Sequence, residues 1–114
     1  RMVYDTARTL AQELQNSEEY RRYHALKEAA MENDTTKTLI AEYHRLQFQA
    51  QAAAMQGKKD DALLEKLQKI GEVLQFDKNA SAYLIAEYQM NRMLSDVYKI
   101  LAEAIDVDLS ALEA

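Results

Sequence analysis

The chain has 114 residues, a formal net charge of −5, no Cys, no Pro and two Gly. The lack of Cys excludes disulfides, thiolate metal sites, iron–sulfur ligation and a Cys nucleophile from this chain. An acidic balance with no basic block disfavours direct binding to nucleic acid. Sheets need turn residues that are scarce here, whereas short polar loops can join helices. We therefore expect one all-α domain over residues 1–114, a helical bundle of about five helices with a long C-terminal helix.

The sequence shows no segment for membrane insertion. No apolar run is long enough to span a bilayer, and no signal-peptide core precedes Val3. These features, with the absence of Cys, predict a cytoplasmic protein. Arg1 before Met2 is interpreted as an addition ahead of the start, and residues 106–114 as a frayed acidic tail.

Apolar residues at steps of three and four predict the first two helices. The first runs from about Val3 to Gln15. The second begins after Asn16, which is expected to act as its N-cap with Glu19 three residues later, and it ends near Asn33. Their apolar faces carry Val3, Ala7, Leu10 and Leu14 in the first helix, and Tyr20, Tyr23, Leu26 and Ala30 in the second.

Two further helices follow between polar caps. Asp34 is the expected N-cap of the third, and Gly57 ends it because Gly accepts the left-handed conformation of a helix stop. Asp60 caps the fourth. Gly71 lies inside the fourth helix, where close approach by a neighbouring helix would explain it. The two apolar stripes are Leu39, Tyr43, Leu46, Ala50 and Ala53, and Leu63, Leu67, Ile70 and Leu74.

The fifth helix is the longest. It is expected to start at Asp77 or Asn79 and to run to about Ile105. At 1.5 Å per residue its length would be about 40 Å, which exceeds the width of a compact domain of this size. The helix therefore either kinks or protrudes and finds a partner. Its apolar stripe is formed by Met90, Leu94, Val97, Leu101 and Ala104.

The pentapeptide LIAEY occurs twice, at residues 39–43 and 84–88. The similarity stops at both edges. The first copy continues its helical stripe into apolar residues, whereas the same steps from the second copy reach Asn91 and Ser95. We interpret the repeat as chance combined with similar packing in two helices. A binding box used twice is the less favoured alternative.

No constellation of residues indicates catalysis. The only histidines, His24 and His44, stand in no Glu-x-x-His pattern, and two isolated glycines cannot form a phosphate loop. Both histidines are interpreted as surface or boundary residues. We therefore expect no enzyme activity and no catalytic, cofactor-binding or metal-binding residues. Glu87 is interpreted as a boundary carboxylate that reaches water or pairs with Arg92, and alternatively as a buried acceptor at an oligomer interface.

Three segments together form a recognisable pattern: NSEEYRRYHALKEAAMEND, LIAEYHRLQFQAQ and AYLIAEYQMNRMLSDVYKILAEAIDVDL. The last is the most specific, with Ala86-Glu87, Met93-Leu94 and the run from Val97 to Ile105. In these segments the chain resembles the YlbF/YmcA/YheA-like family of small helical bacterial proteins, often described as regulators of competence and biofilm development. The resemblance spans nearly the whole chain.

The resemblance implies a helical subunit without enzyme activity that self-associates, usually as a dimer, and works in multiprotein complexes. Some members are linked to developmental signalling, and others to RNA maturation with a membrane-tethered ribonuclease. Some relatives work in complexes carrying iron–sulfur clusters and have Cys near the C-terminus, a feature that this chain lacks. We thus expect a cytoplasmic regulatory adaptor, a homodimer whose partners are homologous family members or RNA-processing machinery. The alternative is a self-associating structural bundle without a regulatory partner.

The residues expected to contribute to the dimer interface lie on the fifth helix. They are Tyr83, Leu84, Glu87, Tyr88, Met90, Leu94, Val97 and Leu101.

Overall fold

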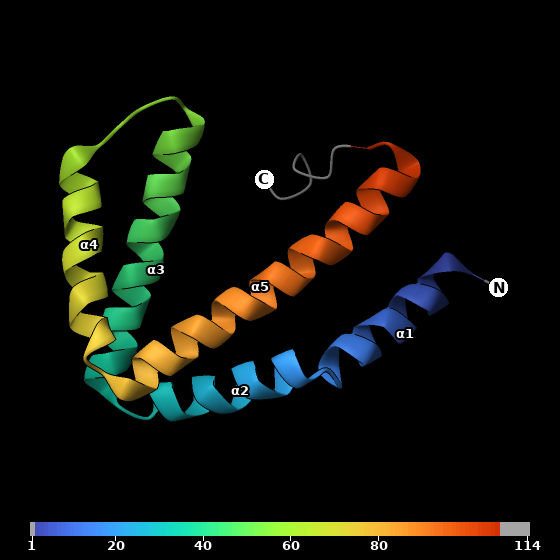
Figure 1. The fold of residues 1–114 in the computed structure, drawn as a ribbon, viewed down its shortest axis with the longest axis horizontal. Coiled ribbons are helices and arrows are strands. Elements are labelled where there is room, and N and C mark those ends of the chain that lie inside the picture. Colours follow the sequence, from blue (N-terminus) through green and yellow to red (C-terminus); the bar gives the residue numbers. More distant parts are fainter. Residues whose placement is uncertain (1, 108–114) are drawn as a thin grey trace. The chain divides into compact units, whose positions relative to one another are not determined.

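The computed structural model describes residues 2–107 and contains helices in all the predicted places (Figure 1). The helices are α1 (Val3–Gln15), α2 (Glu18–Met31), α3 (Asp34–Met55), α4 (Asp61–Gln75) and α5 (Lys78–Ile105). No strand is present in this part of the chain, so the prediction of an all-α fold is confirmed. Over the same residues, no helix combines the length and apolarity that crossing a bilayer requires.

Two helices begin one residue away from the predicted caps. The side chain of Asn33, not that of Asp34, accepts the N–H of Thr36 at 3.0 Å and caps α3. Similarly, Ser17 rather than Asn16 accepts the N–H of Tyr20, at 3.2 Å, at the start of α2. In each case two adjacent residues are of capping type, and the cap is the one whose side-chain oxygen accepts the N–H three residues later. Asn16 instead closes α1.

The predicted cap of the fourth helix is confirmed, and Asp77, one of the two predicted starts of the fifth helix, caps α5. Asp60 accepts the N–H of Leu63 at 3.1 Å, and Asp77 accepts the N–H groups of Asn79 and Ala80 at 3.0 and 3.1 Å. Carboxylates at these positions satisfy backbone donors and complement the positive ends of the helix dipoles. Asp77 therefore decides the start of α5, for which the sequence left two alternatives.

Gly57 ends α3 as predicted. Its φ is +72°, a left-handed conformation that costs an L side chain energy. The N–H of Gly57 donates to the carbonyl of Ala54 at 3.0 Å, and the N–H of Lys58 donates to that of Ala53 at 2.9 Å. This pair of bonds is a Schellman motif, which satisfies the last carbonyls of the helix.

The described residues group into two compact units, residues 24–84 and residues up to 23 together with those from 85 on. Helices α2 and α5 contribute to both. The prediction of a single domain over residues 1–114 stays a prediction.

The unit of residues 24–84 has a packed core, formed mainly by α3 against α4. The ring of Tyr83, at the start of α5, meets that of His44 edge-on, with centroids 6.3 Å apart. Burying each large apolar side chain contributes about 1.5–3 kcal/mol to stability. Among the described residues, the largest fully buried side chains are Ile40, Leu46, Leu74 and Tyr83.

Gly71 lies against α3, as the sequence predicted. A methyl group built on its Cα would stand 3.6 Å from Cε1 of Tyr43, which is ordinary van der Waals contact. A side chain of α3 therefore neighbours Gly71, but a Cβ atom would fit, so the predicted close approach does not explain the glycine.

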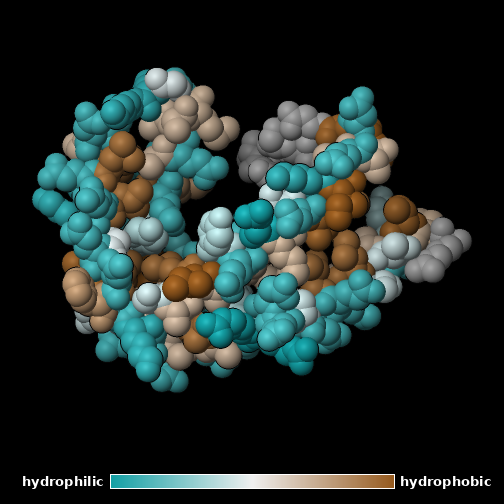
Figure 2. Space-filling view, viewed as in Figure 1, coloured by the Kyte–Doolittle hydropathy of each residue, from teal (hydrophilic) through white to brown (hydrophobic). Residues whose placement is uncertain are grey.

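The other unit has very little core. Helix α1 has no buried residue, and in α5 beyond residue 84 only Ala86 is buried. Figure 1 shows α1 running along α5, and apolar side chains gather between them in Figure 2. This unit is a loosely packed set of helices.

The predicted stripe of α5 is covered only in part. Met90, Leu94 and Val97 are half-buried, whereas Leu101 and Ala104 are exposed. Within the described residues of the unit, nothing covers Leu101 and Ala104, and the role of Leu101 as an interface residue stays a prediction. Helix α5 nevertheless runs for 28 residues without interruption.

The two copies of LIAEY turn different faces inward. Ile40 is 1% exposed and Ile85 is 55% exposed, while Ala86 is buried and its counterpart Ala41 is exposed. This difference argues against a binding box used twice. It also corrects the idea of similar packing, because the same five residues meet different surroundings.

The expected frayed tail lies mostly outside the described residues. Helix α5 ends at Ile105, and Asp106 follows with a φ of +52°. The N–H of Val107 then donates to the carbonyl of Ala102 at 3.4 Å. Residues 108–114 are not described.

Candidate protein-interaction site

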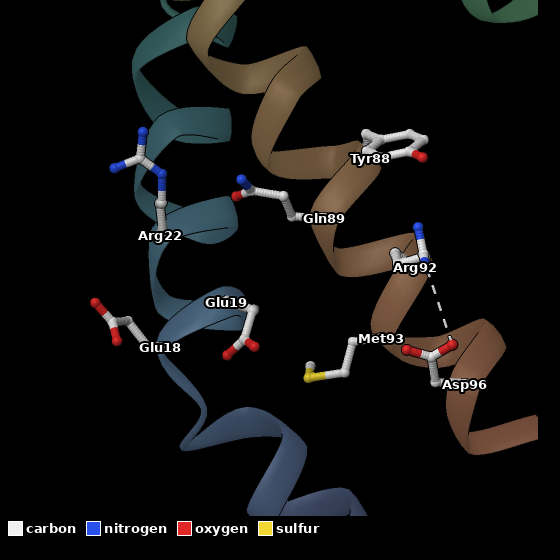
Figure 3. A pocket seen from close by; sticks show the side chains of 8 residues that line it. All are labelled: Glu18, Glu19, Arg22, Tyr88, Gln89, Arg92, Met93 and Asp96. Carbon is white, nitrogen blue, oxygen red and sulfur yellow. Dashed lines mark ion pairs between the residues drawn. The ribbon is translucent and has the colours of Figure 1, made fainter. Parts of the chain in front are cut away.

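An open groove lies between the first turns of α2 and the middle of α5, within one unit (Figure 3). Its volume is about 610 Å³. The lining residues are Glu18, Glu19, Arg22, Tyr88, Gln89, Arg92, Met93 and Asp96.

The start of α2 positions the acidic residues on one wall. Because Ser17 caps the helix, Glu18 and Glu19 occupy its first turn, where the helix dipole stabilises carboxylates. Arg22 follows Glu18 by four residues, so it lies on the same side of α2 about one turn, or 6 Å, further on.

Helix α5 runs antiparallel to α2 along the groove (Figure 3). Its lining residues therefore occur in the reverse order. Tyr88 and Gln89 lie toward Arg22, and Met93 and Asp96 lie toward Glu19. Opposite charges are thus separated along the groove, with carboxylates at one end and guanidinium groups toward the other.

One ion pair between lining residues joins Nε of Arg92 to Oδ1 of Asp96, at 4.0 Å. Both side chains are more than half exposed, and an exposed pair of this length contributes little to stability. On a helix, a pair in which the Arg comes before the acidic residue is also less stabilising than the reverse order, because the reverse order suits the helix dipole. Both charges therefore remain accessible to a partner.

The structure brings only one predicted interface residue into the groove. Tyr88 lines it and is 66% exposed. Leu101 is exposed further along α5, and Tyr83 is 2% exposed in the core of the other unit. The remaining predicted interface residues are half-buried: Leu84, Glu87, Met90, Leu94 and Val97.

None of the acidic residues of the groove, Glu18, Glu19 and Asp96, is among the residues that the sequence predicted for an interface. The sequence does contain a signal for this site, because opposite charges stand four residues apart in two places: Glu18 and Arg22, and Arg92 and Asp96. The two pairs form one site only when α2 and α5 lie antiparallel in this register. A single sequence does not show that pairing.

The described residues show no arrangement suited to metal chemistry. Within residues 2–107, no three His, Asp or Glu side chains lie close enough together to hold a metal ion. His24 is exposed, with Nε2 3.7 Å from a carboxylate oxygen of Glu28, and His44 is half-buried beside Tyr83. The interpretation of both as surface or boundary histidines is confirmed.

The all-α fold, with an open groove in a loosely packed unit, defines a small helical protein without a deep enclosed site among the described residues of that groove. Residues 3–106 match the family model described as "Control of competence regulator ComK, YlbF/YmcA". The chain belongs to this YlbF/YmcA family, which confirms the resemblance drawn from its three segments.

Relatives in other bacteria share most of the chain. It is 39% identical to a UPF0342 protein of Symbiobacterium thermophilum, covering 94% of this chain and 96% of the relative. It is 33% identical to a UPF0342 protein of Halothermothrix orenii, covering 97% and 95% of the two chains. The match covers nearly the full length of both relatives.

Two solved structures share the fold. A Bacillus stearothermophilus protein of unknown function (DUF964) matches with a TM-score of 0.73 and 20% identity, covering 91% of this chain and 92% of that one. A chain of the solved Bacillus subtilis complex of RicA with RicF matches with a TM-score of 0.59 and 18% identity, covering 91% of this chain and 93% of that one. At these identities the likeness shows a common fold.

Proposed function

We propose that this protein is a cytoplasmic, non-enzymatic regulatory adaptor that self-associates and binds other proteins through its helices. The family description, control of a competence regulator, supports a regulatory role. The complex of RicA with RicF supports partner binding as a use of this fold. The proposed partners are homologous family members or RNA-processing machinery.

The observation that carries this proposal is the apolar surface of the unit containing α1. The large apolar side chains near the start of α1 and the end of α5 are all at least 46% exposed: Met2, Val3, Tyr4, Tyr98, Ile100, Leu101 and Ile105. Scattered apolar residues are ordinary on a surface, but a concentration in one unit with little core marks an interaction surface. A second copy that covers it would form a symmetric dimer.

Sedimentation over a range of concentrations tests the self-association. We expect the wild-type protein to be dimeric at micromolar concentration and Ile105→Glu, 62% exposed in the wild type, to shift it toward monomer. Val73→Glu on α4 is the matched control, since Val73 is 55% exposed in the other unit. A wild-type protein that stays monomeric at about 100 µM, some hundredfold above micromolar affinity, contradicts the self-association.

Affinity capture from the native cytosol tests the adaptor role. We expect tagged wild-type protein to recover family members or RNA-processing components, and Tyr88→Glu combined with Met93→Glu to lose them. Both substitutions lie in the groove. Recovery of the protein alone would favour the second candidate, a self-associating structural bundle, for which the exposed apolar surface serves only self-contact.

A further inference from the structure

The groove between α2 and α5 has its charges ordered along its length. Glu18 and Glu19 on one wall and Asp96 on the other mark an acidic end, while Arg22 and Arg92 lie toward the opposite end (Figure 3). On each wall four residues separate the opposite charges, about 6 Å along the helix. A ligand that complements the groove must carry a positive and a negative group at a similar separation.

Two less polar side chains line the groove, Met93 toward its acidic end and Tyr88 toward the other. Met93 is half-buried and extends toward α2, and the ring of Tyr88 is exposed at the rim (Figure 3). Met adapts its shape to a partner, and Tyr provides apolar area with a polar tip. An apolar side chain beside the charged groups of a ligand would contact one of these two residues.

We infer that this groove binds an α-helix of a partner protein whose docking face carries an acidic and a basic residue one turn apart, beside an apolar residue. The inference rests on the proposed adaptor function and deepens it by naming the chemistry of the partner. A helix presents residues four apart on one face at the separation that the groove requires. A helix laid between two antiparallel helices also follows a known mode of peptide recognition.

Charge complementarity selects this occupant over simpler ones. An acidic peptide would place a carboxylate against Glu19 and Asp96, and a basic one would place a cation against the two arginines. Like charges brought together at an interface disfavour binding. The single Arg92–Asp96 pair is exposed and 4.0 Å long, so the partner can replace it at little cost.

Four synthetic helical peptides test the inference on the full chain. They are stapled on the far face so that their helicity is equal, and they share a central Leu. They differ only at two positions one turn apart, occupied by Glu and Lys, two Glu, two Lys or two Gln. We expect the Glu/Lys peptide to bind at least about tenfold tighter than the other three in low salt, measured by fluorescence anisotropy, with the advantage shrinking as salt is added.

A charge-reversal variant sharpens the test. Arg22→Glu with Arg92→Glu makes the groove wholly acidic, so its preference is expected to change to the peptide with two Lys. Lys58→Glu with Lys59→Glu is the matched control, because it makes the same change of charge in the exposed loop between α3 and α4. If circular dichroism shows that the first variant is unfolded, Arg22→Gln with Arg92→Gln replaces it and is expected to remove the preference for Glu/Lys over two Lys.

Several outcomes would overturn the inference. These are equal binding of the four peptides, no binding of the Glu/Lys peptide at about 1 mM, the weak limit of specific affinity, or an unchanged preference in the folded variant. Dissociation of the dimer by the Glu/Lys peptide would also overturn it, since the occupant would then be a second copy. If the protein distinguished the four peptides but the capture experiment recovered no partner, only the proposed adaptor function would be refuted. If partners were captured but the four peptides bound equally, only the helix-binding groove would be refuted.

Discussion

The hydroxyl of Thr36 donates a hydrogen bond to Oδ2 of Asp77 at 2.5 Å, joining the first turn of α3 to the N-cap of α5. Both residues belong to the unit with the packed core, and Thr36 is buried. Asp77 also accepts the N–H groups of Asn79 and Ala80. The Thr36 hydroxyl, then the N–H of Ala80 and to a lesser extent that of Asn79, hold the pKa of Asp77 below its ordinary value, and burial opposes them.

This link predicts a loss of stability in acid. Because the pKa of Asp77 is lower in the folded protein than in the unfolded chain, its contribution is complete above the unfolded pKa of about 3.9. This contribution to stability is lost as the pH falls from the unfolded pKa through the lower pKa of Asp77 in the folded protein. We expect Thr36→Val to lower the free energy of unfolding by about 1 kcal/mol at pH 7 and to raise the pKa of Asp77.

Urea denaturation at pH 7 and pH 3, with an NMR titration of the Asp77 carboxyl, checks this prediction. Thr38→Val is a suitable control, since the hydroxyl of Thr38 is exposed and donates to the carbonyl of Asp34 within its own helix. An Asp77 titration that is the same in wild type and Thr36→Val would show that the hydroxyl does not lower this pKa.

The helix caps give a second prediction, at the start of α3. Asn33 makes the capping bond, whereas Asp34 is the first helical residue. Replacing Asn33 by Ala is expected to cost about 1 kcal/mol, as is usual for a lost N-cap. Asp34→Ala removes only a favourable charge–dipole interaction of about 0.3–1 kcal/mol, which salt screens. Thermal unfolding of both variants at low and high salt measures the difference, and an equal, salt-sensitive loss would assign the cap to Asp34.

These caps show what the sequence can and cannot define. The apolar spacing predicted all five helices, because a core-facing stripe needs only a period near 3.6. The start of α3 was placed one residue late, since Asn33 and Asp34 are both capping residues and only the backbone conformation selects between them. The exposure of Leu101 could not be predicted, because a covered stripe and one that awaits a partner have the same pattern. The groove depends on the register of α2 against α5, which periodicity does not contain.

The two glycines provide a third prediction, in which the same substitution has opposite effects. Gly71 lies within α4, where Ala is favoured by about 0.8–1 kcal/mol, and its added methyl would make ordinary contact with Tyr43. Gly71→Ala is therefore expected to stabilise the protein. Gly57 has a φ of +72°, so Gly57→Ala is expected to cost about 1–2 kcal/mol despite open space around it. Urea midpoints of the two variants test both signs, and destabilisation by Gly71→Ala would mean that the Tyr43 ring cannot adjust.

The repeated pentapeptide gives the last prediction, because Ile40 and Ile85 have the same neighbours in sequence and opposite environments. Ile40 is 1% exposed in the core, and Ile85 is 55% exposed on α5. Ile40→Ala is expected to lower the free energy of unfolding by about 2–5 kcal/mol, the usual cost of a cavity in a core. Ile85→Ala is expected to change it by less than about 0.5 kcal/mol, as an exposed substitution does. Both are measured by urea denaturation under conditions where the protein is monomeric. If the two losses were alike, Ile85 would be covered in solution as Ile40 is, and the two pentapeptides would share a packing role after all.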